Sequence, residues 1–279
     1  MIDLRLGDCL DVLRTMPDNS VDAVITDPPY AEVARSYGRW SEADWHTLMH
    51  AVVREVRRVL TPAGSAMFLV QPNSEHVGQM RPWVWEFMVW CCREWNVVQD
   101  AYWWNFTALP SVHTHRTIGL MRPSLKYCIW LGDPTCYRDQ AGVLWTETQR
   151  NAAARQEGRA LRRYPSGWTK RAARCGDAAL ERGGVTPFNI LPLSNGNSTS
   201  SGGAFGHGAA TPLELCRWWV RYIVRPGGTV LDPFSGTATV GIAAVQEGRS
   251  YIGIERDPGY HEIAAARLTD TQRPPTPPE

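Results

Sequence analysis

Short apolar runs alternate along the chain with longer segments in which apolar residues recur every three or four positions. The apolar runs, which predict buried strands, occupy residues 21–26, 66–70, 97–104, 125–131, 229–232 and 251–254. The segments with helical spacing occupy residues 43–60, 83–95, 212–224, 237–246 and 258–268. Because helices alternate with largely apolar strands, the pattern predicts an α/β sheet covered by helices on both faces.

Three segments depart from this alternation. Between residues 138 and 186, basic residues, alanine and glycine replace the strand pattern. Residues 192–208 (PLSNGNSTSSGGAFGHG) have the composition of a loop. The tail at residues 271–279 (TQRPPTPPE) is proline-rich and is predicted to be disordered. The chain is therefore expected to form one α/β domain with an insertion in its middle.

Composition excludes several classes of protein. With 279 residues, 43% of them hydrophobic, the chain can bury a large core, which excludes a disordered protein. Its seven cysteines include no C-x-x-C pair, which favours reduced thiols in a cytoplasmic protein over disulfides or structural zinc, and no metal site is predicted. No apolar run approaches the ~20 residues of a membrane span, and the start MIDLRLGDCL lacks the features of a signal peptide.

Charge is unevenly distributed along the chain. The formal net charge is only +1, yet residues 148–175 hold eight basic residues against one acidic residue, so the rest of the chain is net acidic. Lys126 and Lys170 are the only lysines among the 29 basic residues. Arginine suits phosphate groups and guanine edges. A genomic preference for arginine codons would produce the same excess, so both explanations stay open.

A first motif spans residues 230–239 (VLDPFSGTAT) and 251–255 (YIGIE). A predicted strand, a tight turn containing Gly236, a helix and a second strand ending at Glu255 follow in the order of a nucleotide-binding βαβ unit. A dinucleotide site uses G-x-G-x-x-G, because the backbone must approach a pyrophosphate, and this turn holds one glycine. The motif favours a nucleoside ligand such as S-adenosylmethionine over NAD; a βαβ unit without a ligand is the alternative.

A second motif, Asp27-Pro28-Pro29-Tyr30, directly follows the strand predicted at residues 21–26. A carboxylate at the carboxyl end of a parallel strand faces the crevice where ligands bind in such sheets. The prolines stiffen the loop and leave carbonyl oxygens as acceptors, and the tyrosine ring can stack on a planar base. These groups suit an exocyclic amine of a nucleobase, although an ordinary proline-rich turn would have the same sequence.

Together the two motifs resemble those of the β-type DNA amino-methyltransferases, which modify adenine N6 or cytosine N4. The resemblance covers residues 2–137 and 187–269, with further matches at Gly7-Asp8-Cys9-Leu10, Trp104-Asn105-Phe106, Leu109-Pro110-Ser111, Asn189-Ile190-Leu191 and Pro212-Leu213-Glu214-Leu215. It implies a permuted Rossmann-like sheet that binds S-adenosyl-L-methionine. The implied parts are a catalytic half (residues 1–137), a target-recognition insertion (138–186), a cofactor-binding half (187–270) and a tail (271–279).

The resemblance also implies an arrangement of strands. Their order would begin with the C-terminal unit, whose strands end at Asp232 and then Glu255, and continue through the N-terminal unit, with Asp8 and then Asp27. The two termini would lie close together, as they do in many domains that tolerate permutation.

The resemblance assigns roles to residues of both motifs. Asp27 and the Pro28 carbonyl would accept the hydrogens of the target amine, and Tyr30 would stack on a base flipped out of the duplex. Glu255 would bind the ribose hydroxyls of the cofactor, Asp8 its adenine amino group, and Asp232 with the following turn its methionine part. The catalytic residues implied are Asp27, Pro28, Pro29 and Tyr30. The cofactor-binding residues implied are Asp8, Cys9, Thr211, Asp232, Pro233, Phe234, Ser235, Gly236, Thr237 and Glu255.

The chain departs from the family pattern at two positions. The turn F-x-G-x-G has Ala238 in place of its second glycine, and H-P-x-x-K-P has Thr211 in place of its lysine, which is expected near the cofactor. In the family, adenine enzymes commonly carry D-P-P-Y and cytosine-N4 enzymes more often S-P-P-Y. The resemblance therefore favours adenine N6, with cytosine N4 as the alternative.

The basic insertion lies where β-type enzymes carry target recognition, so double-stranded DNA is the expected partner. The residues expected to contact DNA are Arg155, Arg159, Arg162, Arg163, Lys170, Arg171 and Arg174. A solvated arginine-rich helix at residues 151–163 is the alternative. A homodimer and a partner restriction nuclease are compatible with the resemblance. Two other functions stay open, namely methylation of RNA or of a protein amide, and DNA binding by a catalytically silent protein.

Overall fold

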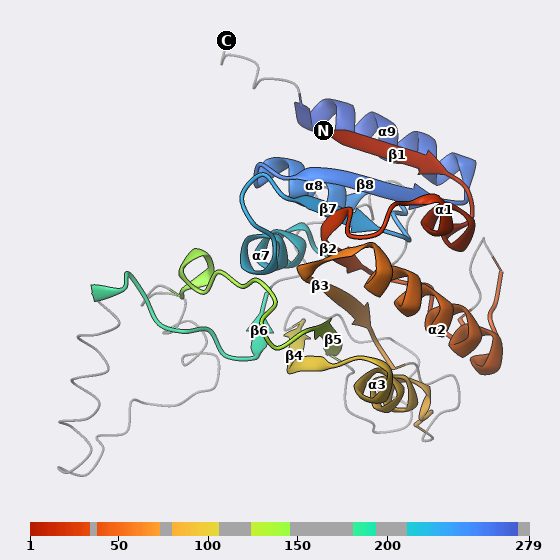
Figure 1. The fold of residues 1–279 in the computed structure, drawn as a ribbon, viewed down its shortest axis with the longest axis horizontal. Coiled ribbons are helices and arrows are strands. Elements are labelled where there is room, and N and C mark those ends of the chain that lie inside the picture. Colours follow the sequence, from red (N-terminus) through yellow and green to blue (C-terminus); the bar gives the residue numbers. More distant parts are fainter. Residues whose placement is uncertain (34–37, 73–79, 106–123, 146–180, 194–210, 273–279) are drawn as a thin grey trace, which may run out of the picture.

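The computed structural model describes residues 1–33, 38–72, 80–105, 124–145, 181–193 and 211–272. Within these ranges the chain forms one eight-stranded sheet in the order β1-β8-β7-β2-β3-β5-β4-β6 (Figure 1). The strands are β1 (Ile2–Leu6), β2 (Val21–Thr26), β3 (Leu60–Val70), β4 (Val97–Trp104), β5 (Leu125–Gly132), β6 (Ile190–Pro192), β7 (Thr229–Asp232) and β8 (Ser250–Glu255).

Helices cover both faces of this sheet, as the sequence pattern predicts (Figure 1). They are α1 (Cys9–Thr15), α2 (Glu42–Val59), α3 (Trp83–Glu94), α7 (Leu213–Ile223), α8 (Thr239–Gln246) and α9 (Pro258–Gln272), with a short 3₁₀ turn η1 (Ala141–Val143). One apolar core lies under α1, α2 and α3 and includes Trp45 and Phe87. The other lies under α7, α8 and α9 and includes Trp219 and Tyr251. The predicted α/β fold is confirmed.

Strand direction determines where a site can form. The neighbouring pairs β1–β8, β8–β7, β7–β2 and β2–β3 are all parallel. Strand β5 runs antiparallel to both β3 and β4. The carboxyl ends of five parallel strands therefore meet at one edge of the sheet, where ligands bind in open α/β folds.

The two ends of the described chain lie side by side, as expected for a permuted fold. Strand β1 pairs with β8, the backbone N–H of Tyr251 donates to the Met1 carbonyl at 2.9 Å, and α9 lies along β1 (Figure 1).

The expected order of strands is wrong in one respect. In space the strand before Asp8 is at the sheet edge beside that of Glu255, and the strand before Asp27 lies beside that of Asp232. From β7 the chain crosses to β8 on one side, and from β2 it crosses to β3 on the other side. A topological switch point therefore lies between β7 and β2.

Several element boundaries differ from the prediction. The apolar pattern did not predict strand β1, helix α1 or strand β6, which are short, although the resemblance implied a strand before Asp8. Strand β3 begins at Leu60 rather than at residue 66, because a register shift against β2 accommodates Pro62 and Gly64 within the strand. Helix α9 continues to Gln272, two residues into the predicted tail, whose other residues lie outside the described ranges.

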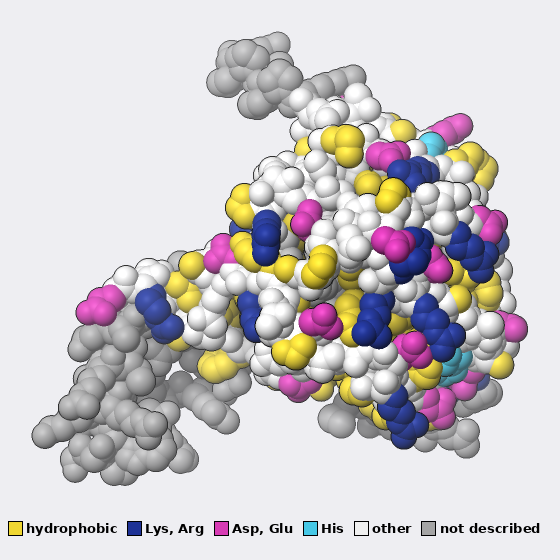
Figure 2. Space-filling view, viewed as in Figure 1, with side chains coloured by type: hydrophobic (Ala, Val, Ile, Leu, Met, Phe, Trp, Pro, Cys, Tyr) yellow, Lys and Arg dark blue, Asp and Glu magenta, His cyan; other side chains and the backbone are white. Residues whose placement is uncertain are grey.

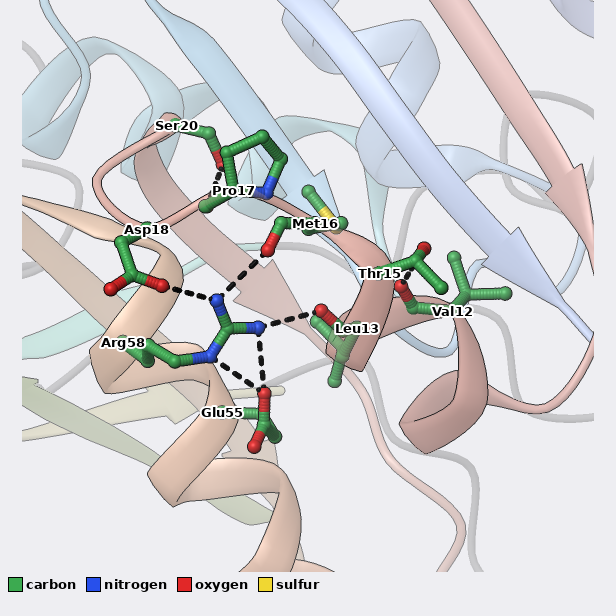
Figure 3. A network of polar contacts seen from close by, with 9 residues as sticks. All are labelled: Val12, Leu13, Thr15, Met16, Pro17, Asp18, Ser20, Glu55 and Arg58. Carbon is green, nitrogen blue, oxygen red and sulfur yellow. Dashed lines mark hydrogen bonds and ion pairs between the residues drawn. The ribbon is translucent and has the colours of Figure 1, made fainter.

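Arg58, near the end of α2, fixes the loop that leads from α1 into β2 (Figure 3). Its guanidinium donates to the carbonyls of Leu13 and Met16, both at 2.8 Å, and to the carboxylates of Asp18 at 2.5 Å and Glu55 at 2.8 Å. The Leu13 carbonyl also accepts from the backbone N–H of Met16 at 2.9 Å, so Arg58 adds a second donor at the end of α1 and a donor to the Met16 carbonyl just beyond it. They connect α2 to the start of β2, the strand that carries the Asp27 loop.

Charge on the described residues is mixed in sign and acidic in sum. The described ranges contain 17 basic and 23 acidic residues, a net charge of −6. Figure 2 shows basic and acidic side chains interspersed over the face that carries α2 and α3. Residues 148–175, which carry a net +7, lie outside the described ranges. No helix in the described ranges has the length and apolar character that a membrane span requires.

Candidate active site

Four carboxylates follow four neighbouring strands at the carboxyl edge of the sheet. In spatial order they are Asp8 after β1, Glu255 at the end of β8, Asp232 at the end of β7 and Asp27 after β2. The backbone N–H of Gly7 donates to the Glu255 carbonyl at 2.9 Å, which joins the β1 and β8 ends. The structure thus brings together residues from opposite ends of the sequence, as the two motifs predicted.

The Asp27-Pro28-Pro29-Tyr30 loop is held from beneath by two tryptophans. The indole N–H of Trp45 donates to the Pro29 carbonyl at 2.6 Å, and the Tyr30 ring lies 6.3 Å from the ring of Trp83. Trp45 and Trp83 are both fully buried. Because these anchors belong to the core, they fix the position of the loop relative to the sheet.

Three donors converge on the Asp27 carboxylate. The Tyr30 hydroxyl donates to Oδ1 at 2.8 Å, while the Lys126 ammonium, at 2.6 Å, and the Thr211 hydroxyl both donate to Oδ2. The ammonium also lies 5.4 Å from the centre of the Tyr30 ring. Lys126 and Thr211 are nearly buried, with 5% and 6% of their surface exposed. Thr211, predicted as a cofactor residue, therefore contacts the catalytic loop.

Asp232 is a fully desolvated carboxylate. Its Oδ1 accepts from the Thr26 hydroxyl at 2.6 Å and from the Phe234 N–H at 3.1 Å. Burial raises the pKa of Asp232 to about 7, against the opposing effect of these two hydrogen bonds. No basic side chain of the described ranges forms an ion pair with it. The Thr26 bond links the end of β7 directly to the residue before Asp27.

The turn after β7 is tied to the end of β8. The N–H groups of Gly236 and Asp257 donate to the two oxygens of Glu255, at 2.7 and 2.8 Å. Burial raises the pKa of Glu255, and these backbone bonds oppose the shift. Within the turn, Gly236 and Ala238 both adopt positive φ, 52° and 60°. The chain must therefore hold an alanine in a conformation that favours glycine.

Side-chain bonds hold the rest of this turn. The Ser235 hydroxyl lies 2.8 Å from that of Tyr251, and the Thr237 hydroxyl accepts from Arg267 at 3.0 Å. The other predicted members of the turn, Pro233 and Phe234, lie between Asp232 and Ser235.

Asp8 and Cys9 begin helix α1. Asp8 is its N-cap, accepting the Leu10 N–H at 2.9 Å. Cys9 is the first residue of the helix, and burial raises the pKa of its thiol to about 12. At that pKa the thiol stays protonated at neutral pH, so Cys9 is a packing residue without the reactivity of a thiolate.

The donor set fits S-adenosyl-L-methionine. Asp232, buried without a cation beside it, suits the ammonium of the methionine part, because an incoming positive charge would compensate its desolvation. Glu255 and Asp8 add acceptors along the same edge, for the ribose hydroxyls and an amino group. The turn after β7 holds one glycine, Gly236, and so lacks the glycine pattern with which a dinucleotide site accommodates a pyrophosphate.

Two side chains of this site were not predicted as site residues. Lys126 lies on β5 and reaches Asp27 from the far side of β3; Thr26, the last residue of β2, bonds Asp232. A signal for Lys126 was present, since a lysine in the apolar run 125–131 shares its strand face with Cys128 and Trp130. The predicted DNA-binding residues Arg155, Arg159, Arg162, Arg163, Lys170, Arg171 and Arg174 lie outside the described residues.

Fold and site together define an S-adenosyl-L-methionine-dependent methyltransferase. A family model described as DNA methylase, of the N6/N4 type, matches residues 21–266, and the chain belongs to this family of DNA methyltransferases. The predicted family and cofactor are confirmed.

Two curated relatives are similar over nearly the whole chain. The Type II methyltransferase M.PvuII of Proteus hauseri is 26% identical over 287 aligned positions, covering 96% of this chain and 83% of the relative. The Type II methyltransferase M.XycI of Xanthomonas campestris pv. cyanopsidis is 29% identical, covering 94% and 86%.

Solved structures show the same fold. The PvuII DNA methyltransferase, described as cytosine-N4-specific, superposes with a TM-score of 0.71 at 20% identity, covering 97% of this chain and 90% of that one. A DNA modification methylase of Thermus thermophilus, solved with S-adenosyl-L-methionine, superposes with a TM-score of 0.61 at 23% identity, covering 97% and 96%. At these identities the likeness concerns the fold.

Proposed function

We propose that this chain transfers a methyl group to the N6 amino group of adenine within a specific DNA sequence. The observation that carries the proposal is the Asp27 carboxylate, which lies beside the cofactor half of the sheet and is joined to it through Thr26 and Asp232. An acceptor at this position suits an exocyclic amine, which must lose a proton as it gains a methyl group.

The number of donors on Asp27 leaves room for such an amine. A carboxylate offers about four lone-pair sites. Lys126 and Thr211 share Oδ2, and Tyr30 uses one site of Oδ1, so one acceptor site of Oδ1 remains. The N–H of the target amine would bond at that site, because the other acceptor sites of Asp27 are occupied.

The chemistry follows from these groups. The amine of adenine or cytosine is a weak nucleophile, because its lone pair is delocalised into the ring. Asp27 and the Pro28 carbonyl would accept its two hydrogens, which favours a pyramidal nitrogen and stabilises the charge that develops there. When bound, S-adenosyl-L-methionine supplies an electrophilic methyl group on a sulfonium. The Tyr30 ring would stack on the flipped base and offset part of the unstacking cost of a few kcal/mol.

The base identity rests on the loop sequence. Asp27 at the head of the loop favours adenine, since S-P-P-Y is the more frequent form among cytosine-N4 enzymes of the resembled family. Cytosine N4 is the second candidate, because the PvuII enzyme, one of the relatives in sequence and in fold, is described as cytosine-N4-specific. Both reactions use the same acceptors.

DNA recognition is assigned to the insertion. The acidic body of the described ranges would repel a duplex, while the net +7 of residues 148–175 would attract it. We infer that the seven basic residues predicted there contact phosphates. A homodimer and a partner nuclease are compatible with the Type II names of the relatives.

Substitution of Asp27 tests this proposal. Asp27→Ala should lower methyl transfer from tritiated S-adenosyl-L-methionine to unmethylated DNA by about 10²- to 10³-fold, since it removes a principal acceptor at the reacting nitrogen. Cofactor affinity, measured by calorimetry, should change less than about threefold, because Thr211 is the one predicted cofactor residue that bonds the Asp27 side chain within the described ranges.

The matched control is Asp11→Ala, which removes an exposed carboxylate on α1 whose ion pair with Arg14 is at the surface. This variant should keep both activity and cofactor affinity. An Asp27→Ala protein that transfers methyl groups at the wild-type rate would refute the role of Asp27.

A further inference from the structure

A buried cation is built into the base-binding side of the site. The Lys126 side chain is 6% exposed and its ammonium lies 2.6 Å from Oδ2 of Asp27. Lys126 projects from β5 on the face it shares with the buried Cys128 and Trp130. A lysine in an apolar strand has a large desolvation cost, which its pairing with a carboxylate offsets. Since apolar residues in place of a buried ion pair are often equally stable or more stable, a buried ion pair is weak evidence for a role in stability alone.

Lys126 contacts both functional side chains of the loop. Its ammonium pairs with Asp27 and lies over the ring of Tyr30, at 5.4 Å from the centroid. The Tyr30 hydroxyl in turn bonds the other Asp27 oxygen. Each of the three side chains thus contacts the other two. With Oδ2 held by Lys126, rotation of the carboxylate is blocked and Oδ1 keeps its open site.

Position 211 reaches the same oxygen from another element. Thr211, just before α7, donates to Oδ2 of Asp27 beside the Lys126 ammonium. In this chain the cation at Asp27 comes from β5, and position 211 contributes a neutral donor.

We propose that Lys126 is a positioning residue for methyl transfer, which fixes the Asp27 carboxylate and the Tyr30 ring, and that a cation at this point is required whichever element supplies it. This proposal rests on the proposed function. It differs from a purely structural role, because a cation delivered from position 211 should replace one delivered from position 126.

The test moves the positive charge from position 126 to position 211. Lys126→Met and Lys126→Ala should each slow single-turnover methyl transfer by about 10- to 100-fold, since the acceptor loses its fixed orientation. Cofactor affinity should stay within about threefold of wild type. Among the predicted cofactor residues, Thr211 is the one linked to Lys126, and that link runs through the Asp27 oxygen to which both side chains donate. The double variant Lys126→Ala/Thr211→Lys should regain at least about tenfold in rate over Lys126→Ala, as the new lysine occupies the space vacated by the old one.

Control measurements distinguish failure of the proposed role of Lys126 from failure of the proposed function. Arg14→Met removes a cation from an exposed ion pair on α1 and should leave the rate unchanged. If the wild type transfers methyl groups and Lys126→Met does so equally fast, the role of Lys126 is overturned while the proposed function stands. A double variant that binds cofactor and keeps its melting temperature, yet is as slow as Lys126→Ala, also overturns it. A wild-type protein that methylates no DNA overturns both proposals.

Discussion

At the residue scale, Asp232 is a buried carboxylate whose titration should change the stability of the protein. It ends β7 with 2% of its surface exposed, and its only hydrogen bonds among the described residues come from Thr26 and the Phe234 N–H. Desolvation raises the pKa of Asp232 from 3.8 to about 7. An acid whose pKa is raised in the folded state binds more protons there than in the unfolded chain between these values.

Stability should therefore fall with rising pH in this window. The contribution of the protonated form is complete below about pH 4 and is lost as the pH rises through about 7. Between pH 5 and pH 8 the wild type should lose on the order of 1–3 kcal/mol more free energy of unfolding than Asp232→Asn. Urea unfolding at the two pH values measures this difference. Equal losses in both proteins would show that Asp232 is not the group that titrates.

The sequence predicted those site residues that lie within continuous motifs. Asp27 and Asp232 each follow an apolar strand directly, and parallel strands bring such positions to one edge, so local pattern sufficed. Lys126 was not predicted, because its contact with Asp27 depends on the antiparallel placement of β5 beside β3. Thr26 was missed because a strand residue next to a motif has no distinguishing sequence signal.

At the scale of elements, α8 and β8 are packed at the limit of contact. Gly241 of α8 faces the fully buried ring of Tyr251 on β8, and a Cβ at Gly241 would lie 2.5 Å from Cε1 of that ring. The Tyr251 hydroxyl also bonds Ser235 in the turn after β7. The packing of this helix is thereby coupled to the shape of the turn.

Gly241→Ala should destabilise the protein despite the better helix propensity of alanine. The propensity gain is about 1 kcal/mol, whereas overpacking a rigid core costs about 1–3 kcal/mol. We expect a net loss of up to about 2 kcal/mol in the free energy of unfolding and weaker cofactor binding, measured by urea unfolding and calorimetry. The control is the same substitution in a Tyr251→Val background, where the added methyl group should cost nothing. A stabilised Gly241→Ala protein would contradict the close packing.

Elements were predictable where they are long or fully apolar. Strands β2 and β7 and helices α2, α3 and α7 agree with the predicted ranges to within one residue, because burial on both faces or a regular stripe marks them. Strand β6 has three residues and carries too little pattern. The early start of β3 depends on its register against β2, which no local pattern encodes.

On the scale of the whole molecule, the near-zero net charge conceals two parts of opposite sign. The described body has a net charge of −6, with four carboxylates along one sheet edge, and residues 148–175 carry +7. The permuted topology makes that edge from both ends of the chain, since β1 and β2 flank β8 and β7. Chemistry is therefore assigned to the acidic sheet and DNA contact to the basic insertion.

Identification of the methylated nucleoside tests the central claim most directly, namely that this sheet edge methylates an exocyclic amine of DNA through Asp27. Unmethylated DNA would be incubated with the wild type or Asp27→Ala and S-adenosyl-L-methionine, digested to nucleosides and analysed by mass spectrometry against N6-methyladenine, N4-methylcytosine and C5-methylcytosine standards. We predict N6-methyladenine with the wild type and, over the same early time course, about 10²- to 10³-fold less with Asp27→Ala. N4-methylcytosine in the same pattern would transfer the assignment to the second candidate base. A C5-methylcytosine product, or no methylated nucleoside from a wild type that binds the cofactor, would contradict the account.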